Sequence, residues 1–150
     1  MRRRPAAVSL VELLVVLAVL ALIAGLTFGA VRVGSAQRTA RLYLRTVHAA
    51  RLDAVAGRPA AVRWRPEAAA FEVRRGADPC AAAVARTLVP EAGVAVTRWL
   101  RAGVAWLPDG TGRSCDGGGV YGGRVRFEDR RTAWDVVVAS TGRLRLERVP

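Results

Sequence analysis

The sequence LLVVLAVLALIAGLTFGAV, residues 13–31, is an unbroken run of nineteen uncharged residues. It follows a single carboxylate, Glu12, and a basic leader that begins Met1-Arg2-Arg3-Arg4. As an α-helix, nineteen residues span about 29 Å, close to the ~30 Å hydrocarbon core of a bilayer, so this segment is predicted to cross a membrane. A lone acidic residue at the mouth of such a segment is costly to hold in lipid. We therefore predict that Glu12 is functional and that its partner is an amine.

The rest of the chain, about 115 residues, is long enough for one compact domain with its own core. The 24 basic residues are all arginine and outnumber the 12 acidic residues, which gives a formal net charge of +12. A preference for arginine codons explains the absence of lysine, but it does not explain the excess of basic over acidic residues. A polyanionic or anionic-lipid partner is therefore compatible with the composition.

The helix is expected to continue past the apolar run to about residue 56. No proline occurs between 32 and 56, and Gly57 followed by Arg58-Pro59 is a typical helix stop. Small and apolar residues recur at spacings of three and four, a pattern that packs against a sheet; they are Ala36, Ala40, Tyr43, Val47, Ala50 and Ala54. The single histidine, His48, lies on another face with several arginines and is interpreted as a surface residue.

Beyond Pro59 the hydrophobic pattern changes to period two, which indicates strands. We expect strands at 60–65, 71–73, 94–99, 124–127, 132–139 and 143–149, with turns near 66–67, 108–112, 128–129 and 140–142. The predicted fold class is α+β: one long N-terminal helix, of which the first half is transmembrane and the second half packs on an antiparallel sheet.

Cys80 and Cys115 are the only cysteines of the chain. In an oxidising compartment they could form a disulfide, which would contribute about 4 kcal/mol by the chain-entropy model. The alternative is two free, partly buried thiols.

The stretch AVSLVELLVVLA, residues 7–18, resembles the class III signal of type IV pilins and type II secretion pseudopilins. The resemblance implies that a prepilin peptidase cuts between Ala7 and Val8 and methylates the amine of Val8. It also implies that Glu12 pairs with the N-terminal amine of a neighbouring subunit during filament assembly. Ala7 stands where the family usually has glycine, and Val8 where it usually has phenylalanine or methionine. The alternative for Glu12 is a side chain that simply reaches the lipid headgroups.

This resemblance divides the chain into a leader, residues 1–7, a membrane and assembly segment, residues 8–31, and a periplasmic domain, residues 32–150. The protein is thus expected in the bacterial inner membrane with a single span, and later in a filament. Three further stretches resemble the GspH/FimT branch of pseudopilins and minor pilins: ARLDA at 50–54, LPDGT at 107–111 and VVVASTGRLR at 136–145. Residues 75–106 match no motif.

No set of residues supports catalysis, because the chain has one histidine, no lysine and no pair of carboxylates within a glycine-bounded site. We expect a non-enzymatic subunit without metal or cofactor, whose partners are other pilins, the prepilin peptidase and the inner membrane. The stretch GRLR at 142–145 resembles the pattern of DNA-binding FimT-like minor pilins, which implies an alternative function, non-specific DNA binding during DNA uptake. Its predicted residues are Arg143 and Arg145 on one face of the last strand, extended by Arg148, Arg124 and Arg126. The competing interpretation is an ordinary solvated strand face that also carries Glu147.

Overall fold

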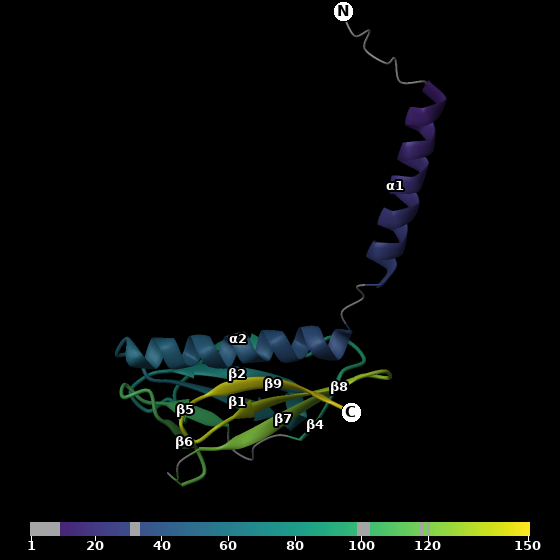
Figure 1. Ribbon diagram of the computed structural model, residues 1–150. Helices are drawn as coiled ribbons and strands as arrows, with labels where there is room; N and C mark the ends of the chain where they lie inside the picture. Colours follow the sequence, from purple (N-terminus) through teal and green to yellow (C-terminus); the bar gives the residue numbers. More distant parts are fainter. Residues whose placement is uncertain (1–9, 31–33, 99–102, 118, 120) are drawn as a thin grey trace, which may run out of the picture. The chain divides into compact units, whose positions relative to one another are not determined.

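The computed structural model describes residues 10–30, 34–98, 103–117, 119 and 121–150 (Figure 1). The chain divides into two compact units, residues 1–33 and residues 34–150. The described part of the first unit is helix α1, Leu10–Ala30, which is apolar apart from Glu12 in its first turn. Judged by length and mean hydropathy, no helix in the described part of the chain qualifies as a membrane span. Residues 8, 9 and 31 of the predicted span lie outside the described residues.

The predicted unbroken helix from residue 8 to 56 is wrong at Gly34. This residue has φ −58° and ψ 152°, an extended conformation, and helix α2, Ser35–Val55, begins directly after it. The cause is a tertiary cap: Oδ2 of Asp129, far along the chain, accepts hydrogen bonds from the Ala36 amide and the Ser35 hydroxyl, both at 3.0 Å. Because these donors are satisfied by Asp129, α2 has a defined start. At its other end α2 stops before Gly57, which has φ 81°, as the sequence predicts.

The second unit contains two antiparallel sheets where the sequence predicted one. The five-stranded sheet has the order β3-β2-β1-β5-β6, with β1 at Ala60–Arg65, β2 at Ala70–Arg75, β3 at Val84–Leu88, β5 at Val104–Trp106 and β6 at Gly112–Ser114. The four-stranded sheet has the order β4-β7-β8-β9, with β4 at Ala95–Arg98, β7 at Gly123–Glu128, β8 at Ala133–Val138 and β9 at Leu144–Val149. A 3-10 turn, Pro66–Ala68, joins β1 to β2 at the predicted interruption. The α+β class is confirmed.

Strands β3, β5 and β6 are absent from the sequence prediction. Two of them have only three residues, too few to show a period. Strand β3 is exposed at four of its five positions, so it lacks the alternation of apolar and polar residues that marks a half-buried strand.

Helix α2 packs on both sheets, and it contacts β1 and β5 of one and β7, β8 and β9 of the other (Figure 1). All six residues of the predicted apolar stripe, Ala36, Ala40, Tyr43, Val47, Ala50 and Ala54, are at most 2% exposed. The Tyr43 ring lies 4.4 Å from that of Phe71 on β2 and 5.4 Å from that of Phe127 on β7, measured between centroids. The alanines let the helix approach closely, and Tyr43 fills the space between the two sheets.

Replacing Asp129 should weaken the start of α2. We expect Asp129→Ala to lower the free energy of unfolding by about 1–2 kcal/mol at pH 7, the usual range for a lost helix cap. The amides of Ala36 and Arg131 hold the pKa of Asp129 well below its usual range. The carboxylate therefore stabilises the fold fully above its unfolded pKa of about 3.9, and this contribution is lost as the pH falls toward the lower folded pKa.

Urea unfolding of the wild type and the variant should thus differ most at neutral pH and converge progressively below about pH 4. Asp116→Ala, in an exposed loop, is the control and should change stability by less than about 0.5 kcal/mol. A difference between wild type and Asp129→Ala that is independent of pH would refute the capping role.

Candidate functional site

The residues predicted for processing and assembly belong to the first unit. Ala7 and Val8 lie outside the described residues, and Glu12 is exposed in the first turn of α1. The large apolar side chains described around it, from Leu10 to Ile23, are 52–74% exposed. A helix that is apolar on all faces normally lies in a membrane or in the core of an assembly. Helix α1, taken by itself, therefore has an apolar surface on all of its faces.

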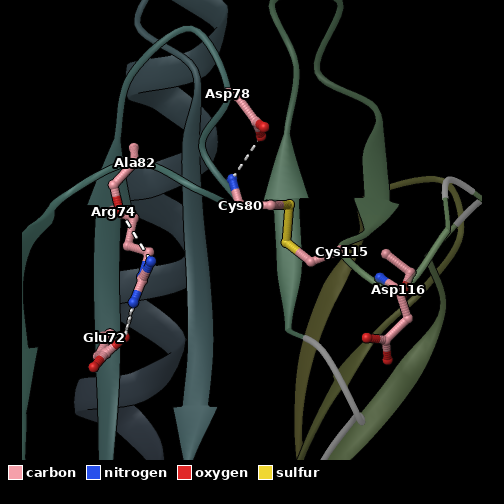
Figure 2. The surroundings of a disulfide bond; sticks show 8 residues. Glu72, Arg74, Asp78, Cys80, Ala82, Cys115 and Asp116 are labelled. Atoms are coloured by element: carbon pink, nitrogen blue, oxygen red, sulfur yellow. Dashed lines mark hydrogen bonds and ion pairs between the residues drawn. A yellow bond between two sulfur atoms is a disulfide. The ribbon is translucent and has the colours of Figure 1, made fainter.

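The structure joins Cys80 and Cys115 in a disulfide with Cα atoms 5.5 Å apart (Figure 2). Cys80 lies in the loop after β2, and Cys115 directly follows β6 at the edge of the same sheet. Arg74 on β2 also contacts this loop, because its Nη1 donates a hydrogen bond to the Ala82 carbonyl at 3.1 Å. The Nη2 of Arg74 donates to Glu72 on the same strand at 2.7 Å. The bridge and the arginine thus fix a loop that has no regular structure of its own.

The predicted arginine patch contains a buried carboxylate that sequence analysis did not identify. Asp135 on β8 is 1% exposed, and it accepts hydrogen bonds from Arg126 at 2.8 and 3.1 Å and from Arg124 at 3.0 Å. Burial acts to raise the pKa of Asp135, but the hydrogen bond and charge of Arg126, together with those of Arg124, outweigh it and leave the pKa below its usual value. Arg124 and Arg126 therefore neutralise a structural charge. The signal for this in the sequence is only that Asp135 interrupts an apolar strand.

The remaining predicted arginines do not form one patch: Arg143 and Arg145 lie at one end of β9, and Arg148 lies at the other. Arg145 on β9 is opposite Val137, which in turn is opposite Arg124, so these positions share the outer face of the four-stranded sheet. Arg143 and Arg145 are exposed, while Leu144 and Leu146 pack against the core as predicted. Nη1 of Arg145 lies 3.5 Å from Glu147. Arg148 is opposite Trp134, at the other end of β9 and on the other face, and does not extend the patch.

Arg51 on α2 connects all three stretches that resemble the GspH/FimT branch. Its Nη1 donates to the Gly142 carbonyl at 2.9 Å, and its guanidinium lies 5.6 Å from the ring centroid of Trp106, next to the LPDGT stretch. Gly110 and Gly142 both have positive φ, 76° and 79°, and a Cβ built on Gly142 would be 3.0 Å from the Arg51 guanidinium carbon. Arg51 therefore attaches one turn from each sheet to the helix.

Asp53 has a similar role at the next charged position of ARLDA. Its carboxylate accepts from Arg58, beyond the end of the helix, at 3.0 Å and from Arg75 on β2 at 2.7 Å. The charged residues of this motif thus stabilise the packing of α2, and the sequence alone did not indicate that purpose.

An apolar N-terminal helix joined to a second helix on antiparallel sheets defines a pilin-like protein. Residues 2–28 match the prokaryotic N-terminal methylation motif. Among solved structures, the minor pseudopilin EpsH from the Type 2 Secretion System of Vibrio cholerae has a similar fold, with a TM-score of 0.59 and 13% sequence identity over 77% of this chain and 98% of that chain. No curated protein gives a significant sequence match.

The motif and the fold together confirm the resemblance to GspH-type minor pseudopilins that the sequence predicted. The chain has the fold of a minor pseudopilin and carries a prokaryotic N-terminal methylation motif.

Two glycine substitutions test the close contact at Arg51. Gly142→Ala combines an unfavourable positive φ with a Cβ pressed against the guanidinium, so we expect a loss of about 2–3 kcal/mol in the free energy of unfolding. Gly57→Ala is the matched control, because Gly57 has φ 81° but no atom within 4 Å of an added Cβ. It should cost about 1 kcal/mol. Equal losses in chemical denaturation would show that Arg51 does not restrict this turn.

Proposed function

We propose that this chain is a minor pilin or pseudopilin subunit that is held in the inner membrane by residues 8–31 and is then incorporated into a filament. A prepilin peptidase cuts between Ala7 and Val8, removes residues 1–7 and methylates the new amine. The observation that carries the proposal is the methylation motif at residues 2–28, which overlaps an apolar helix with one carboxylate in its first turn. The filament would be that of a type II secretion system or a type IV pilus.

In the proposed assembly, Glu12 pairs with the Val8 amine of a neighbouring subunit. Each charge alone is costly in an apolar environment, and the pair offsets this cost only when the two groups are well matched. Apolar contact between helices has no preferred axial position, whereas a single charge pair has one. The pair would therefore set the axial register of the subunit.

Replacing Glu12 tests this assembly step. We expect Glu12→Ala to reduce the recovery of the subunit in sheared filaments, or with partner pilins, by about tenfold or more, since each ~1.4 kcal/mol of weakening changes an equilibrium tenfold. The amount in the membrane fraction should stay the same, because the apolar segment is unchanged. Glu147→Ala, on the outer face of the domain, is the control. Unchanged assembly of Glu12→Ala would contradict the register role.

DNA binding is the second candidate function, and it is supported by the exposure of Arg143 and Arg145. Strand β9 turns its leucines inward and Arg145 outward, where its Nη1 lies 3.5 Å from Glu147, and Arg143 directly precedes the strand. Exposed guanidinium groups of this kind can contact phosphates. Arg124 and Arg126 contribute less than the sequence suggested, because they pair with Asp135. DNA binding by so few arginines would be weak, sensitive to salt and indifferent to sequence.

A titration of the domain, residues 34–150, with duplex DNA at two salt concentrations tests this second function. We expect Arg143→Ala/Arg145→Ala to weaken binding at low salt and to reduce the slope of log K against log salt by about 2, roughly one for each phosphate that the variant no longer neutralises. Arg130→Ala/Arg131→Ala is the control with the same change in charge. No binding at low salt, or equal weakening in both variants, would exclude DNA recognition by Arg143 and Arg145.

A further inference from the structure

Three exposed arginines gather near the start of α2, and neither the fold nor the proposed function explains them. Arg130 and Arg131 form the tip of the β7–β8 hairpin, and Arg148 lies near the end of β9. Together they line a hollow of about 530 Å³ at the surface of the domain. We call these three residues the proximal arginine cluster. Within the described residues, none of the three takes part in an ion pair.

Two carboxylate side chains line the same hollow, those of Glu128 and Asp129. Glu128 is exposed at the end of β7, and no ion pair joins it to the three arginines within the described residues. The Oδ1 of Asp129 accepts from the amides of Arg131 and Thr132, and its Oδ2 accepts from Ser35 and Ala36. These hydrogen bonds hold the hairpin tip against the start of α2 and direct the carboxylate toward backbone donors. In the described part of the chain, neither carboxylate forms an ion pair with the three guanidinium groups, whereas Arg124 and Arg126 are both paired with Asp135.

The covalent chain limits where this cluster can act. Ser35, whose hydroxyl contacts Asp129, is five residues from Ala30, the last residue of α1, so an extended chain between them cannot exceed about 18 Å. If residues 8–31 lie in a bilayer, as the proposed function requires, the hairpin tip is tethered within reach of the lipid headgroups. Arg143 and Arg145 lie toward the opposite end of β9, because Leu144 pairs with Val138 whereas Val149 pairs with Ala133.

We propose that the proximal arginine cluster binds the phosphates of anionic phospholipids in the membrane that holds residues 8–31. Guanidinium groups form bidentate, charge-assisted hydrogen bonds with phosphate oxygens, and a hollow with three such groups can accept a headgroup. The contact would hold the domain against the bilayer surface before the subunit is extracted into a filament. A partner with this chemistry agrees with the excess of basic residues over acidic ones.

The test uses the domain alone, residues 34–150, so that α1 cannot insert. This part has its own core, because every buried core residue of the described chain lies between Ala36 and Val138. The domain is sedimented with vesicles of phosphatidylcholine alone and with vesicles of phosphatidylcholine and phosphatidylglycerol in equal parts. We expect binding only to the anionic vesicles, with release at high salt.

The decisive variant is Arg130→Gln/Arg131→Gln/Arg148→Gln. Each basic residue near an anionic surface changes partitioning by about fivefold, so the triple variant should bind on the order of 100-fold more weakly. The hairpin double variant Arg130→Gln/Arg131→Gln leaves β9 intact and should bind about 25-fold more weakly, which keeps the test valid if the triple variant folds poorly. Arg45→Gln/Arg86→Gln/Arg113→Gln removes the same charge from exposed positions on α2, β3 and β6 and should bind like the wild type.

Equal weakening in the cluster variant and its charge-matched control would overturn the proposal, as would the absence of binding to anionic vesicles. Loss of duplex DNA binding by the cluster variant, with lipid binding intact, would instead assign the cluster to nucleic acid. Failure here leaves the assembly role of Glu12 untouched, since the domain tested lacks residues 8–31. Failure of the Glu12→Ala experiment likewise does not alter the vesicle result.

Discussion

The contact of Tyr43 with Phe71 and Phe127 is the interaction on which the domain depends. The two phenylalanines belong to different sheets, their ring centroids are 5.8 Å apart, and Tyr43 of α2 lies against both. Neither sheet could bury its apolar face alone, so the helix that covers both is required for a single core. The small residues on either side of Tyr43 allow the close approach, and any larger side chain at Ala40 or Ala50 would push the helix away from one sheet.

Polar contacts position the two ends of α2 on this core. Asp129 caps its start from the β7–β8 hairpin, while Arg51 and Asp53 attach its last turns to the two sheets. The proximal arginine cluster therefore lies near the start of α2, and the turn that precedes Arg143 lies near its end. The proposed lipid contact and the alternative DNA contact thus lie at opposite ends of one rigid helix.

Arginine content alone is a poor guide to function in this chain, and the structure shows why. Arg38, Arg74, Arg75, Arg124 and Arg126 all pair with carboxylates. The paired groups hold loops and strands together and contribute little net charge to the surface. What distinguishes Arg130, Arg131 and Arg148 is that none of them forms an ion pair within the described residues, although Glu128 and Asp129 line the same hollow. Asp129 is instead hydrogen-bonded to the backbone.

Resemblance to a family motif predicted the methylation motif. Local pattern in the sequence was sufficient to predict the apolar helix with Glu12, the buried stripe of α2, the positions of β4 and of the six-residue strands, and the turns between them. These features depend on residues close together in the chain, where period and spacing are visible. Only the tertiary structure decided that the helix breaks at Gly34, that the strands divide into two sheets, and that Asp135 neutralises part of the predicted arginine patch. Each of those outcomes depends on a partner at least nine residues away, as with Asp129 and Ala36 or Asp135 and Arg126. Such pairings leave no period in the sequence, because they are set by how the helix and the two sheets pack.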